Sequence, residues 1–407
     1  MGFPIFDIEV TGPLPPLSLS RLEQGCALLI RRTGRPIEFL LPEDVLPADG
    51  GEGALARLIA FRAGKQILAA AIHEELLSRT PEIDPPSVTA VICTHDRPAY
   101  VARCLASLRN IVLPDGFPSM HLSVLVVDNA PSDDQTRNVV EEFPGVRYVC
   151  EKKPGLDFAR NRAWQEATGW IVAFLDDDVV VDRGWLQGLL EGYRVCPTAA
   201  GFTGLVLPYE LETEAQLLFE KRGGFRRGFE RIVYGQRMPG NSLYPAGAGI
   251  FGAGANMAFV RDVLERIGGF DEALDTGAPL PGGGDLDMFY RIVRSGYAIV
   301  YEPRYLVFHQ HRREISALRR QYKSWGLGMM SFVAKAHRTD PAERKKILRL
   351  VAWWVRYQVL LLLRGLRGQR QFRPDFVLAE MLGGLIGLCG EYDRSLRRVG
   401  EIRRRFP

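Results

Sequence analysis

The sequence has few cysteines, and their spacing argues against two kinds of structural support. Its 407 residues include six cysteines, none of them in a Cys-x-x-Cys pair. Neither a zinc site nor a disulfide framework is therefore expected, and a reducing compartment is the default. The N-terminus lacks the basic start and apolar run of a signal peptide, so we expect the mature chain to begin near Met1. Arg356 and Glu380 interrupt the most apolar C-terminal segments, so no bilayer-spanning helix is expected.

Several nucleotide and hydrolase motifs are missing as well. The chain contains neither the Walker sequence GxxxxGK[ST] nor the GxSxG nucleophile motif, which argues against a P-loop nucleotide hydrolase and a serine hydrolase. Gly247, Gly249 and Gly252 satisfy GxGxxG, but no apolar strand precedes them. A glycine-rich loop is expected there, and not a dinucleotide site.

Enough apolar sequence is present for a full core. Hydrophobic residues make up 46% of the chain and charged residues 25%, which is the average for globular proteins and excludes a disordered chain. The length is two to three times that of a typical domain. We therefore expect one large domain with appendages, or two domains.

The near-neutral net charge of +4 hides two electrostatically different parts. Residues 1–311 hold 30 Lys and Arg against 40 Asp and Glu, a formal charge of −10, whereas residues 312–407 hold 22 against 8, a formal charge of +14. A basic tail of this kind usually meets an anionic surface, such as a membrane, a nucleic acid or a polyphosphate.

Composition divides the chain into three regions. Residues 1–84 read as a small α+β region, with a hairpin turning at Thr33, Gly34 and Arg35, a helix over 54–78 and a proline-rich linker after it. Residues 85–311 form the central domain. Residues 312–407 read as three helices, at 314–337, 343–366 and 376–390. The tail either packs on the domain or lies in a membrane interface, where its Trp, Leu and Arg residues would suit it.

The central region has the pattern of an α/β fold. Short apolar runs alternate with amphipathic, helix-like stretches, as a parallel sheet covered on both faces requires. Ligands of such sheets bind at the carboxyl ends of the strands. The runs are VTAVIC (88–93), LSVLVV (122–127), VRYV (146–149) and WIVAFL (170–175).

Three adjacent carboxylates, Asp176, Asp177 and Asp178, follow the last of these runs. Side by side at the end of a buried strand they repel one another, so a cation must offset them. Alternation along an extended backbone points Asp176 and Asp178 the same way. Together they could hold Mg²⁺ or Mn²⁺ and leave coordination positions for phosphate oxygens. The alternative is an acidic turn or helix cap.

A second acidic pair, Asp285 and Asp287, follows three glycines at the predicted start of a helix. The helix dipole favours ionised carboxylates there, so either could remove a proton from an attacking hydroxyl group. Simple helix capping is the alternative for one of them.

Other polar residues fall at or near the predicted strand ends. Arg97 could meet a phosphate, and Asp128 could accept hydrogen bonds from a base or a ribose. Arg160 and Asn161 lie in a predicted helix, where they either reach the cleft at the strand ends or are polar residues on the solvent-exposed side of the helix. Thr94 and Asp96 are further candidates at the end of the first strand. His309 and His311 lie on one face of a later strand, where they could be metal ligands, phosphate donors or structural residues.

Six segments together resemble, in order and spacing, the family 2 glycosyltransferases of GT-A fold. The resemblance covers about 88–311 and implies a Rossmann-like central sheet, a nucleotide-diphosphate-sugar donor, a Mn²⁺ or Mg²⁺ ion and inversion at the anomeric carbon. The segments are VTAVICTHDRPAYVARCLASL, SVLVVDNAPSDD, GLDFARNRAW, IVAFLDDDVV, GANMAFVRDVLERIGGFDE and GGGDLDMFYRIVRSGY.

The resemblance also implies residue roles. Asp285 matches the base of the family's Glu-Asp pair, but Gly284 stands where Glu is common, which puts acceptor handling in question. The three carboxylates match the family's metal and diphosphate motif, with Asp178 as the direct metal ligand and Asp176 and Asp177 toward the nucleotide, while Asp128 matches the acid that recognises the base and Thr94 a nucleotide contact. To these we add candidates from the residues alone: Asp176 and His309 as further metal ligands, Asp96, Arg97 and Asn161 toward the donor nucleotide, and Asp287 and Asn256 toward the acceptor or its neighbours.

The expected function is therefore a metal-assisted, inverting sugar transfer to a saccharide or lipid-linked acceptor, in polysaccharide, glycolipid or glycoside biosynthesis. The expected location is cytoplasmic, with peripheral contact to an anionic membrane at the inner face of the plasma membrane. No nucleic-acid partner is expected, since stacking aromatics at suitable spacing are missing. The alternatives are a nucleotidyl- or phosphoryl-transferase with a similar metal site and a non-catalytic membrane-docking scaffold.

Overall fold

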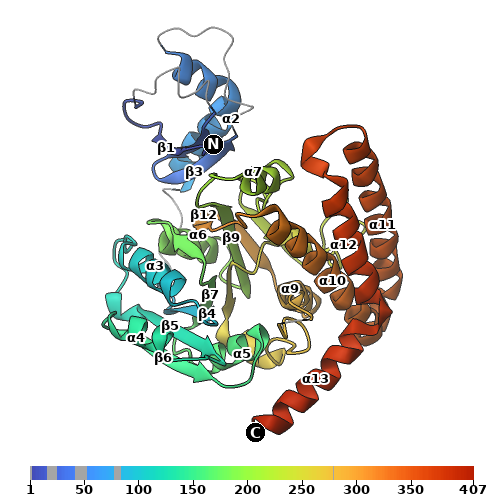
Figure 1. Ribbon diagram of the computed structural model, residues 1–407. Helices are drawn as coiled ribbons and strands as arrows, with labels where there is room; N and C mark the ends of the chain where they lie inside the picture. Colours follow the sequence, from blue (N-terminus) through green and yellow to red (C-terminus); the bar gives the residue numbers. More distant parts are fainter. Residues whose placement is uncertain (1, 16–24, 42–52, 78–83, 278) are drawn as a thin grey trace.

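The computed structural model describes residues 2–15, 25–41, 53–77, 84–277 and 279–407. Figure 1 shows a small N-terminal region, a central α/β region and a layer of C-terminal helices beside it. The predicted fold class is confirmed: a mostly parallel central sheet carries helices, with an α+β region before it and a helical extension after it. All six cysteines are free.

In the described ranges the central sheet has nine strands, in the order β10-β12-β9-β11-β7-β4-β5-β6, with β8 paired to β12. The four predicted apolar runs are β4 to β7, and the core forms around them. The strands are β4 (Val88–Thr94), β5 (Leu122–Asn129), β6 (Val146–Glu151), β7 (Ile171–Asp176), β8 (Val179–Val181), β9 (Gly201–Pro208), β10 (Ile232–Tyr234), β11 (Asn256–Val260) and β12 (Ile299–His309).

The pairing directions bring the polar strand ends to one edge of this sheet. Strands β4, β5, β6 and β7 are mutually parallel, and β9 is parallel to β12. Strand β11 runs antiparallel to both β7 and β9, so β9 and β12 run in the same direction as β7. The carboxyl ends at Thr94, Asp176 and His309 therefore share an edge, which is where an open α/β sheet binds its ligands.

Helices flank this sheet. Helices α3 and α4 pack together, α5 packs against β4 and β5, and α6 packs against β12, as short crossovers between neighbouring strands require. Gly247–Gly252 forms a loop with one short 3₁₀ turn at Ala248–Ile250, as predicted. The helices are α3 (Pro98–Arg109), α4 (Gln135–Glu141), α5 (Leu156–Glu166), α6 (Trp185–Val195), α7 (Glu214–Lys221), α8 (Arg261–Arg266) and α9 (Gly284–Arg294).

The N-terminal region contains the predicted hairpin, β2 (Ala27–Arg32) and β3 (Arg35–Leu40), and helix α2 (Ala54–Leu77). Strand β1 (Ile5–Glu9) was not predicted and pairs parallel with β2. Because side chains alternate along a strand, β2 buries both of its faces. Leu28 and Ile30 pack with residues of α2, while Ala27 and Leu29 pack with residues of β9 and β12.

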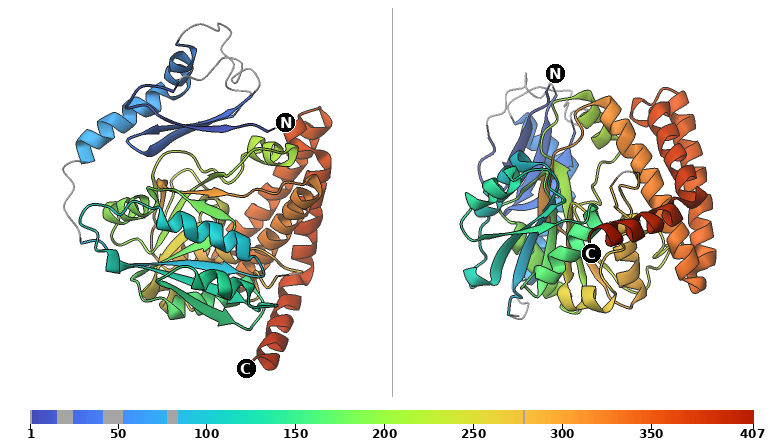
Figure 2. Two further views of the ribbon diagram at one scale, coloured as in Figure 1. Left: turned by 60° about the vertical axis from the view of Figure 1, so that its left-hand side comes forward. Right: turned by 60° about the horizontal axis from the view of Figure 1, so that its bottom comes forward.

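Ion pairs fix this region to the central domain. Arg31 lies 2.6 Å from Asp182, with both side chains buried, and Arg35 lies 2.8 Å from Glu302. Figure 2 shows the small sheet lying against the central domain. The region is therefore docked through a buried apolar face and paired charges, which single-sequence patterns did not indicate.

The C-terminal extension contains α10 (Ile315–Thr339), α11 (Arg344–Leu366), α12 (Pro374–Ile386), a π-turn at Gly387–Glu391 and α13 (Tyr392–Arg405). The three predicted helices correspond to α10, α11 and α12, whereas α13 was missed. Helices α10 and α12 nearly touch through their backbones: a Cβ added at Gly326 or Gly383 would lie 1.9 Å from a carbonyl oxygen of the other helix. Only glycine permits this approach.

Charged residues also hold the extension in place. Glu380, which interrupts an apolar run in the sequence, pairs with Arg222, directly after α7, and accepts a hydrogen bond from Gln358 at 2.7 Å. Lys335 of α10 lies 2.7 Å from both Asp271 and Asp287. In the part of the chain that the structure describes, none of the helices has the length and apolarity needed to cross a bilayer.

Candidate active site

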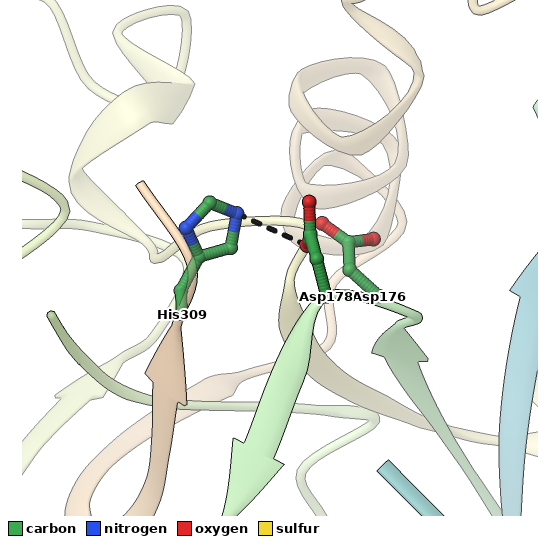
Figure 3. A group of neighbouring side chains, drawn as sticks. All are labelled: Asp176, Asp178 and His309. Atoms are coloured by element: carbon green, nitrogen blue, oxygen red, sulfur yellow. Dashed lines mark ion pairs between the residues drawn. The ribbon is translucent and has the colours of Figure 1, made fainter. Parts of the chain in front are cut away.

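The carboxyl edge of the central sheet gathers a potential metal-binding group. Asp176 at the end of β7, Asp178 before β8 and His309 at the end of β12 each offer one ligand atom, and these three atoms lie within 4.8 Å of one another. His309 Nε2 lies 3.2 Å from Asp178 Oδ1. Figure 3 shows these two side chains pointing toward one another, with Asp176 beside Asp178. Two segments far apart in the sequence, 176–178 and the end of β12, thus converge on one point.

Asp177 is held apart from this group. Thr94 Oγ1 donates a hydrogen bond to Asp177 Oδ2 at 2.7 Å, and Arg97 Nη1 donates to Asp177 Oδ1 at 3.0 Å. Arg97 also lies 3.4 Å from Asp178 Oδ2, and Arg312 lies 3.8 Å from that same oxygen. Thr94 and Arg97, both expected near the donor, therefore lie beside the three carboxylates.

The pKa shifts of the three acids follow their surroundings. Burial, with the neighbouring Asp178 charge, raises the pKa of Asp176 to about 6. Burial and Asp178 also raise the pKa of Asp177. For Asp178 burial acts in the same direction, but His309, Arg312 and Arg97 outweigh it and lower its pKa. Asp178 is thus the most strongly ionised of the three, as a direct metal ligand should be.

The two histidines lie in one buried row. His309 Nδ1 lies 3.0 Å from His311 Nδ1, and His311 Nε2 lies 2.8 Å from Oε1 of Glu220 in α7. Burial lowers the pKa of His311. Burial also opposes protonation of His309, but Asp178 outweighs it and raises the pKa of His309.

The end of β5 carries the residues expected to contact a nucleotide. Asp128 is fully buried and accepts a hydrogen bond from Tyr148 Oη at 3.0 Å, while its Oδ1 atom has no hydrogen-bond partner. Burial raises the pKa of Asp128. Asp96 accepts a hydrogen bond from the backbone of Ser132 at 2.9 Å, which lowers its pKa. Asp128 therefore retains an unused acceptor at this strand end.

Asp285 lies in the first turn of α9, on the other side of a short backbone segment from Asp176. Its Oδ2 atom accepts a hydrogen bond from the amide of Gly254 at 3.1 Å. The next residue, Ala255, accepts a hydrogen bond from the amide of Asp176 at 3.4 Å. Residues 254–255 are thus bonded by the Asp285 carboxylate and by the backbone of Asp176, and the Arg160 charge acts on both acids.

A buried cluster behind Asp285 explains why glycine occupies position 284. A Cβ added to Gly284 would lie 2.1 Å from Asp157 Oδ2 and 2.7 Å from Asp275 Oδ2. Arg160 donates to Asp157 at 2.9 Å and to Asp275 at 3.3 Å, and the amide of Gly284 donates to Asp275 at 2.9 Å. Two aspartates therefore fill the space into which a side chain at position 284 would project.

The pKa shifts in this cluster reflect burial and mutual repulsion. Burial and the adjacent Asp275 raise the pKa of Asp157 well above its ordinary value, and burial raises that of Asp275. Burial disfavours the charged form of Arg160, but Asp157, Asp275, Asp176 and Asp285 outweigh it and raise its pKa. One guanidinium thus stabilises acids on both sides of the site.

Three predicted site residues have their polar atoms occupied elsewhere. Asp287 is buried and lies 2.7 Å from both Arg291 and Lys335. Asn256 is buried, accepts from Trp185 Nε1 at 3.1 Å and donates to Tyr305 O at 2.7 Å. Asn161 bonds the amide and carbonyl of Phe270, with its side chain also contacting Trp164 and Glu272. Their expected roles toward ligands stay predictions, while these contacts join structural elements.

Sequence reasoning missed several residues of the site. Asn129 accepts a hydrogen bond from the amide of Gly155 at 2.8 Å and donates to the carbonyl of Lys153 at 2.7 Å, so it holds the loop that begins α5. Asn129 could have been identified from the sequence, because it is a polar residue at the carboxyl end of β5. Three other acids could not be identified from the sequence in this way, because none of them ends a strand. Asp157 lies in α5, Glu220 lies in α7, and Asp275 lies in a loop.

We predict that Gly284→Ala destabilises the protein, because its Cβ would displace one of two buried carboxylates. An overpacked site of this kind costs about 1–3 kcal/mol, and sugar transfer should fall as Asp285 moves with its helix. Urea denaturation measures the free energy of unfolding. Gly249→Ala is the matched control, because an added Cβ there meets nothing within 4 Å. Equal stability of Gly284→Ala and wild type would contradict the packing argument.

Part of this chain is similar to known proteins. Residues 89–267 match the family described as glycosyl transferase family 2. The glucosyl-dolichyl phosphate glucuronosyltransferase of Haloferax volcanii is 24% identical over 186 residues, 45% of this chain and 56% of that protein. The pre-mycofactocin glycosyltransferase of Mycobacterium tuberculosis is 30% identical over 245 residues, 57% of this chain and 45% of that protein. The chain spans about half the length of these curated relatives.

Among solved structures, a mannosyltransferase of Pyrobaculum calidifontis in complex with GDP-Man and Mn²⁺ aligns with a TM-score of 0.48 and 18% identity. The alignment covers 81% of this chain and 97% of that protein. The family match spans β4 to α8 and includes Asp128 and the three carboxylates Asp176–Asp178. Residues 89–267 of this chain are thus similar to glycosyl transferase family 2.

Proposed function

We propose that this chain transfers a sugar from a nucleotide-diphosphate-sugar to an acceptor hydroxyl group, with inversion at the anomeric carbon. The observation that carries the proposal is the pairing of a metal-type group, Asp176, Asp178 and His309, with a separate carboxylate, Asp285, across residues 254–255. The first group suits a diphosphate, and the second suits deprotonation of a hydroxyl group.

The donor set fits a divalent cation. Two carboxylate oxygens and one imidazole nitrogen match the oxygen and nitrogen ligands that Mn²⁺ accepts, and Mg²⁺ shares the preference for carboxylates. Asp178, whose pKa is lowered by its cationic neighbours, is already ionised, as a metal ligand must be. A bound Mn²⁺ or Mg²⁺ would neutralise the diphosphate leaving group. Which of the two ions is used is left to experiment.

We assign the nucleotide to the carboxyl ends of β4 and β5. Asp128 has an unused acceptor oxygen at the end of β5, suited to an N–H group of a base. Arg97 and Arg312 are partly exposed beside Asp178 and can pair with phosphate oxygens. Thr94, Asp96 and Asp177 complete the nucleotide side of the proposed donor site.

Asp285 acts as the base in the proposed reaction. Its carboxylate takes the proton of the acceptor hydroxyl group while the hydroxyl oxygen forms a bond to the anomeric carbon. The bond from that carbon to the diphosphate oxygen breaks from the opposite face, so the configuration inverts and a nucleoside diphosphate leaves. The amide of Gly254, 3.1 Å from Asp285 Oδ2, holds the carboxylate in place by donating a hydrogen bond to its charged form.

The acceptor is proposed to be a saccharide or a lipid-linked molecule. One relative is named as a transferase acting on a glucosyl-dolichyl phosphate, whereas another is named for pre-mycofactocin. These names differ in acceptor, so they support the broad class of polysaccharide, glycolipid or glycoside synthesis and no single compound.

A nucleotidyl- or phosphoryl-transferase is the main alternative chemistry, because it also uses carboxylates, metal and a nucleotide. Products separate the two. Sugar transfer or hydrolysis releases UDP, GDP or TDP from a panel of sugar nucleotides, whereas nucleotidyl transfer releases pyrophosphate from nucleoside triphosphates. Asp285, a carboxylate separate from the metal group and bonded to the amide of Gly254, favours the former because it can act as the base.

The C-terminal helices favour contact with an anionic membrane surface. Helix α11 lies on the outer side of the C-terminal layer (Figure 1) and exposes Trp353 (48%) and Leu360 (54%) to solvent. Arg356 and Arg364 are exposed on the same helix. Apolar side chains interspersed with arginines suit the interface of an anionic bilayer. We therefore propose peripheral membrane contact, which would bring the site near a lipid-linked acceptor.

Asp285→Asn should lower kcat for sugar transfer by about 10²–10⁴-fold, because the amide cannot take the acceptor proton. The affinity for the nucleoside diphosphate should change little, since Asp285 is assigned to the acceptor side. Steady-state kinetics and calorimetric titration measure the two effects. Asp262→Asn, in the first turn of α8, is the matched control. Wild-type transfer by Asp285→Asn would exclude this base.

Removal of divalent metal should abolish transfer, and added Mn²⁺ or Mg²⁺ should restore it, because Asp176 and Asp178 would otherwise repel the diphosphate. The measurement is product formation in excess EDTA, with EDTA already saturated with Mg²⁺ as the control for effects of the chelator. Undiminished activity in free EDTA would show that the group Asp176, Asp178 and His309 has no metal role.

The double substitution Trp353→Glu with Leu360→Glu should weaken binding to anionic vesicles at low salt by at least about tenfold, because it replaces two apolar contacts with like-charged ones. Co-sedimentation with vesicles of phosphatidylglycerol and phosphatidylcholine measures this. Phe61→Glu with Leu68→Glu is the matched control, since these residues are exposed at the same spacing on α2. Equal losses in both variants, or no binding by wild type, would refute this surface.

A further inference from the structure

A row of buried side chains runs from the proposed metal site to helix α7. Asp178 Oδ1 lies 3.2 Å from His309 Nε2, His309 Nδ1 lies 3.0 Å from His311 Nδ1, and His311 Nε2 lies 2.8 Å from Glu220 Oε1. His309, His311 and Glu220 are all buried. Neither His311 nor Glu220 is one of the three grouped ligands, so their arrangement needs another explanation.

The direction of each hydrogen bond follows from the chemistry of the end residue. The carboxylate of Glu220 can only accept, so His311 must carry a proton on Nε2. A neutral imidazole has one N–H group, which leaves Nδ1 of His311 as an acceptor. His309 must then donate from Nδ1, and when its ring is neutral, as a metal ligand must be, its Nε2 has a free lone pair.

That lone pair is directed at Asp178. His309 Nε2 and Asp178 Oδ1 are only 3.2 Å apart, and two lone pairs at this distance repel each other unless a proton or a metal cation lies between them. Imidazole must be neutral to ligate a metal, and the partner of its other nitrogen determines which nitrogen is available. The hydrogen-bonded row therefore leaves Nε2 of His309, the nitrogen on the side of Asp178, available to a metal ion.

We propose that Glu220 and His311 are positioning residues that hold the proton of His309 on Nδ1 and present its Nε2 atom to the metal. This inference rests on the proposed metal site. It assigns a role to α7, a helix outside the residues matched to the donor or acceptor.

Side chains around His309, His311 and Glu220 stabilise this hydrogen-bond pattern. Arg226 Nε lies 3.2 Å from Glu220 Oε2, so the guanidinium lies beside the carboxylate oxygen that does not contact His311. Aromatic rings pack on the imidazoles: Phe219 lies 4.6 Å from His311 and Phe225 lies 5.1 Å from His309, between ring centroids. Such apolar walls offer the ring nitrogens no competing polar partner.

The first test reads the tautomers directly. Nitrogen NMR of the full-length protein labelled with ¹⁵N-histidine, recorded with Mg²⁺ at pH 8.5 and assigned with His309→Gln and His311→Gln, should show His309 protonated on Nδ1 and His311 on Nε2. A proton on Nε2 of His309, or on Nδ1 of His311, would overturn the proposal. This measurement uses the wild-type protein, so it does not depend on any variant folding well.

The second test measures metal affinity. Glu220→Gln supplies an amide that can donate to His311 and favour the opposite tautomers, so Mn²⁺ binding followed by electron paramagnetic resonance should weaken about 10–100-fold. Glu214→Gln, an exposed residue of the same helix, should bind Mn²⁺ within about twofold of wild type. Unchanged Mn²⁺ affinity in Glu220→Gln would overturn the proposal.

The two tests separate this inference from the proposed function. Failure of the wild-type protein to bind Mn²⁺, with or without a nucleoside diphosphate, would refute the metal site itself. Normal binding of Mn²⁺ by wild type, together with reversed tautomers, would refute only the role of Glu220 and His311.

Discussion

The mutual repulsion of three adjacent, mostly buried carboxylates is the constraint on which the rest of the site depends. The three carboxylates lie at the end of β7: Asp176 is its last residue, and Asp177 and Asp178 follow directly. Burial alone would favour their neutral forms. Positive charge comes from elements far apart in the sequence: Arg97 follows β4, and His309 and Arg312 lie at and beyond the end of β12. The order of strands in the sheet brings these elements together, so the negative charges of the three carboxylates are balanced only when the sheet has formed.

The same principle operates behind the proposed base. Arg160 is buried with Asp157 and Asp275, and its charge also acts on Asp176 and Asp285. A guanidinium surrounded by four acids stabilises both halves of the site at once. The two inner aspartates occupy the space next to Gly284, which gives a steric reason for the missing glutamate of the family's Glu-Asp pair. The glycine at position 284 and the buried acid cluster therefore belong to one packing arrangement.

The sequence predicted the parts of the molecule that have local patterns. The apolar runs of β4 to β7 and the three carboxylates after β7 were readable because strand burial and strand-end polarity are properties of short segments. Strand β1 was missed because its pairing with β2 is non-local, and α13 because its sequence is mostly polar and basic. Glu220, Asp157 and Asp275 were missed for a related reason: their burial depends on which distant cations fold against them.

Both appendages contact the short helix that carries Glu220. Arg226, which pairs with Glu220, donates to the carbonyl of Phe39 in the N-terminal region at 3.3 Å. Arg222, at the end of the same helix, pairs with Glu380 of the C-terminal extension. Helix α7 has only eight residues, too few to hold its position without tertiary contacts. The two appended regions therefore clamp the helix from opposite ends of the chain, so the position of His309 depends on segments that lie outside the family domain.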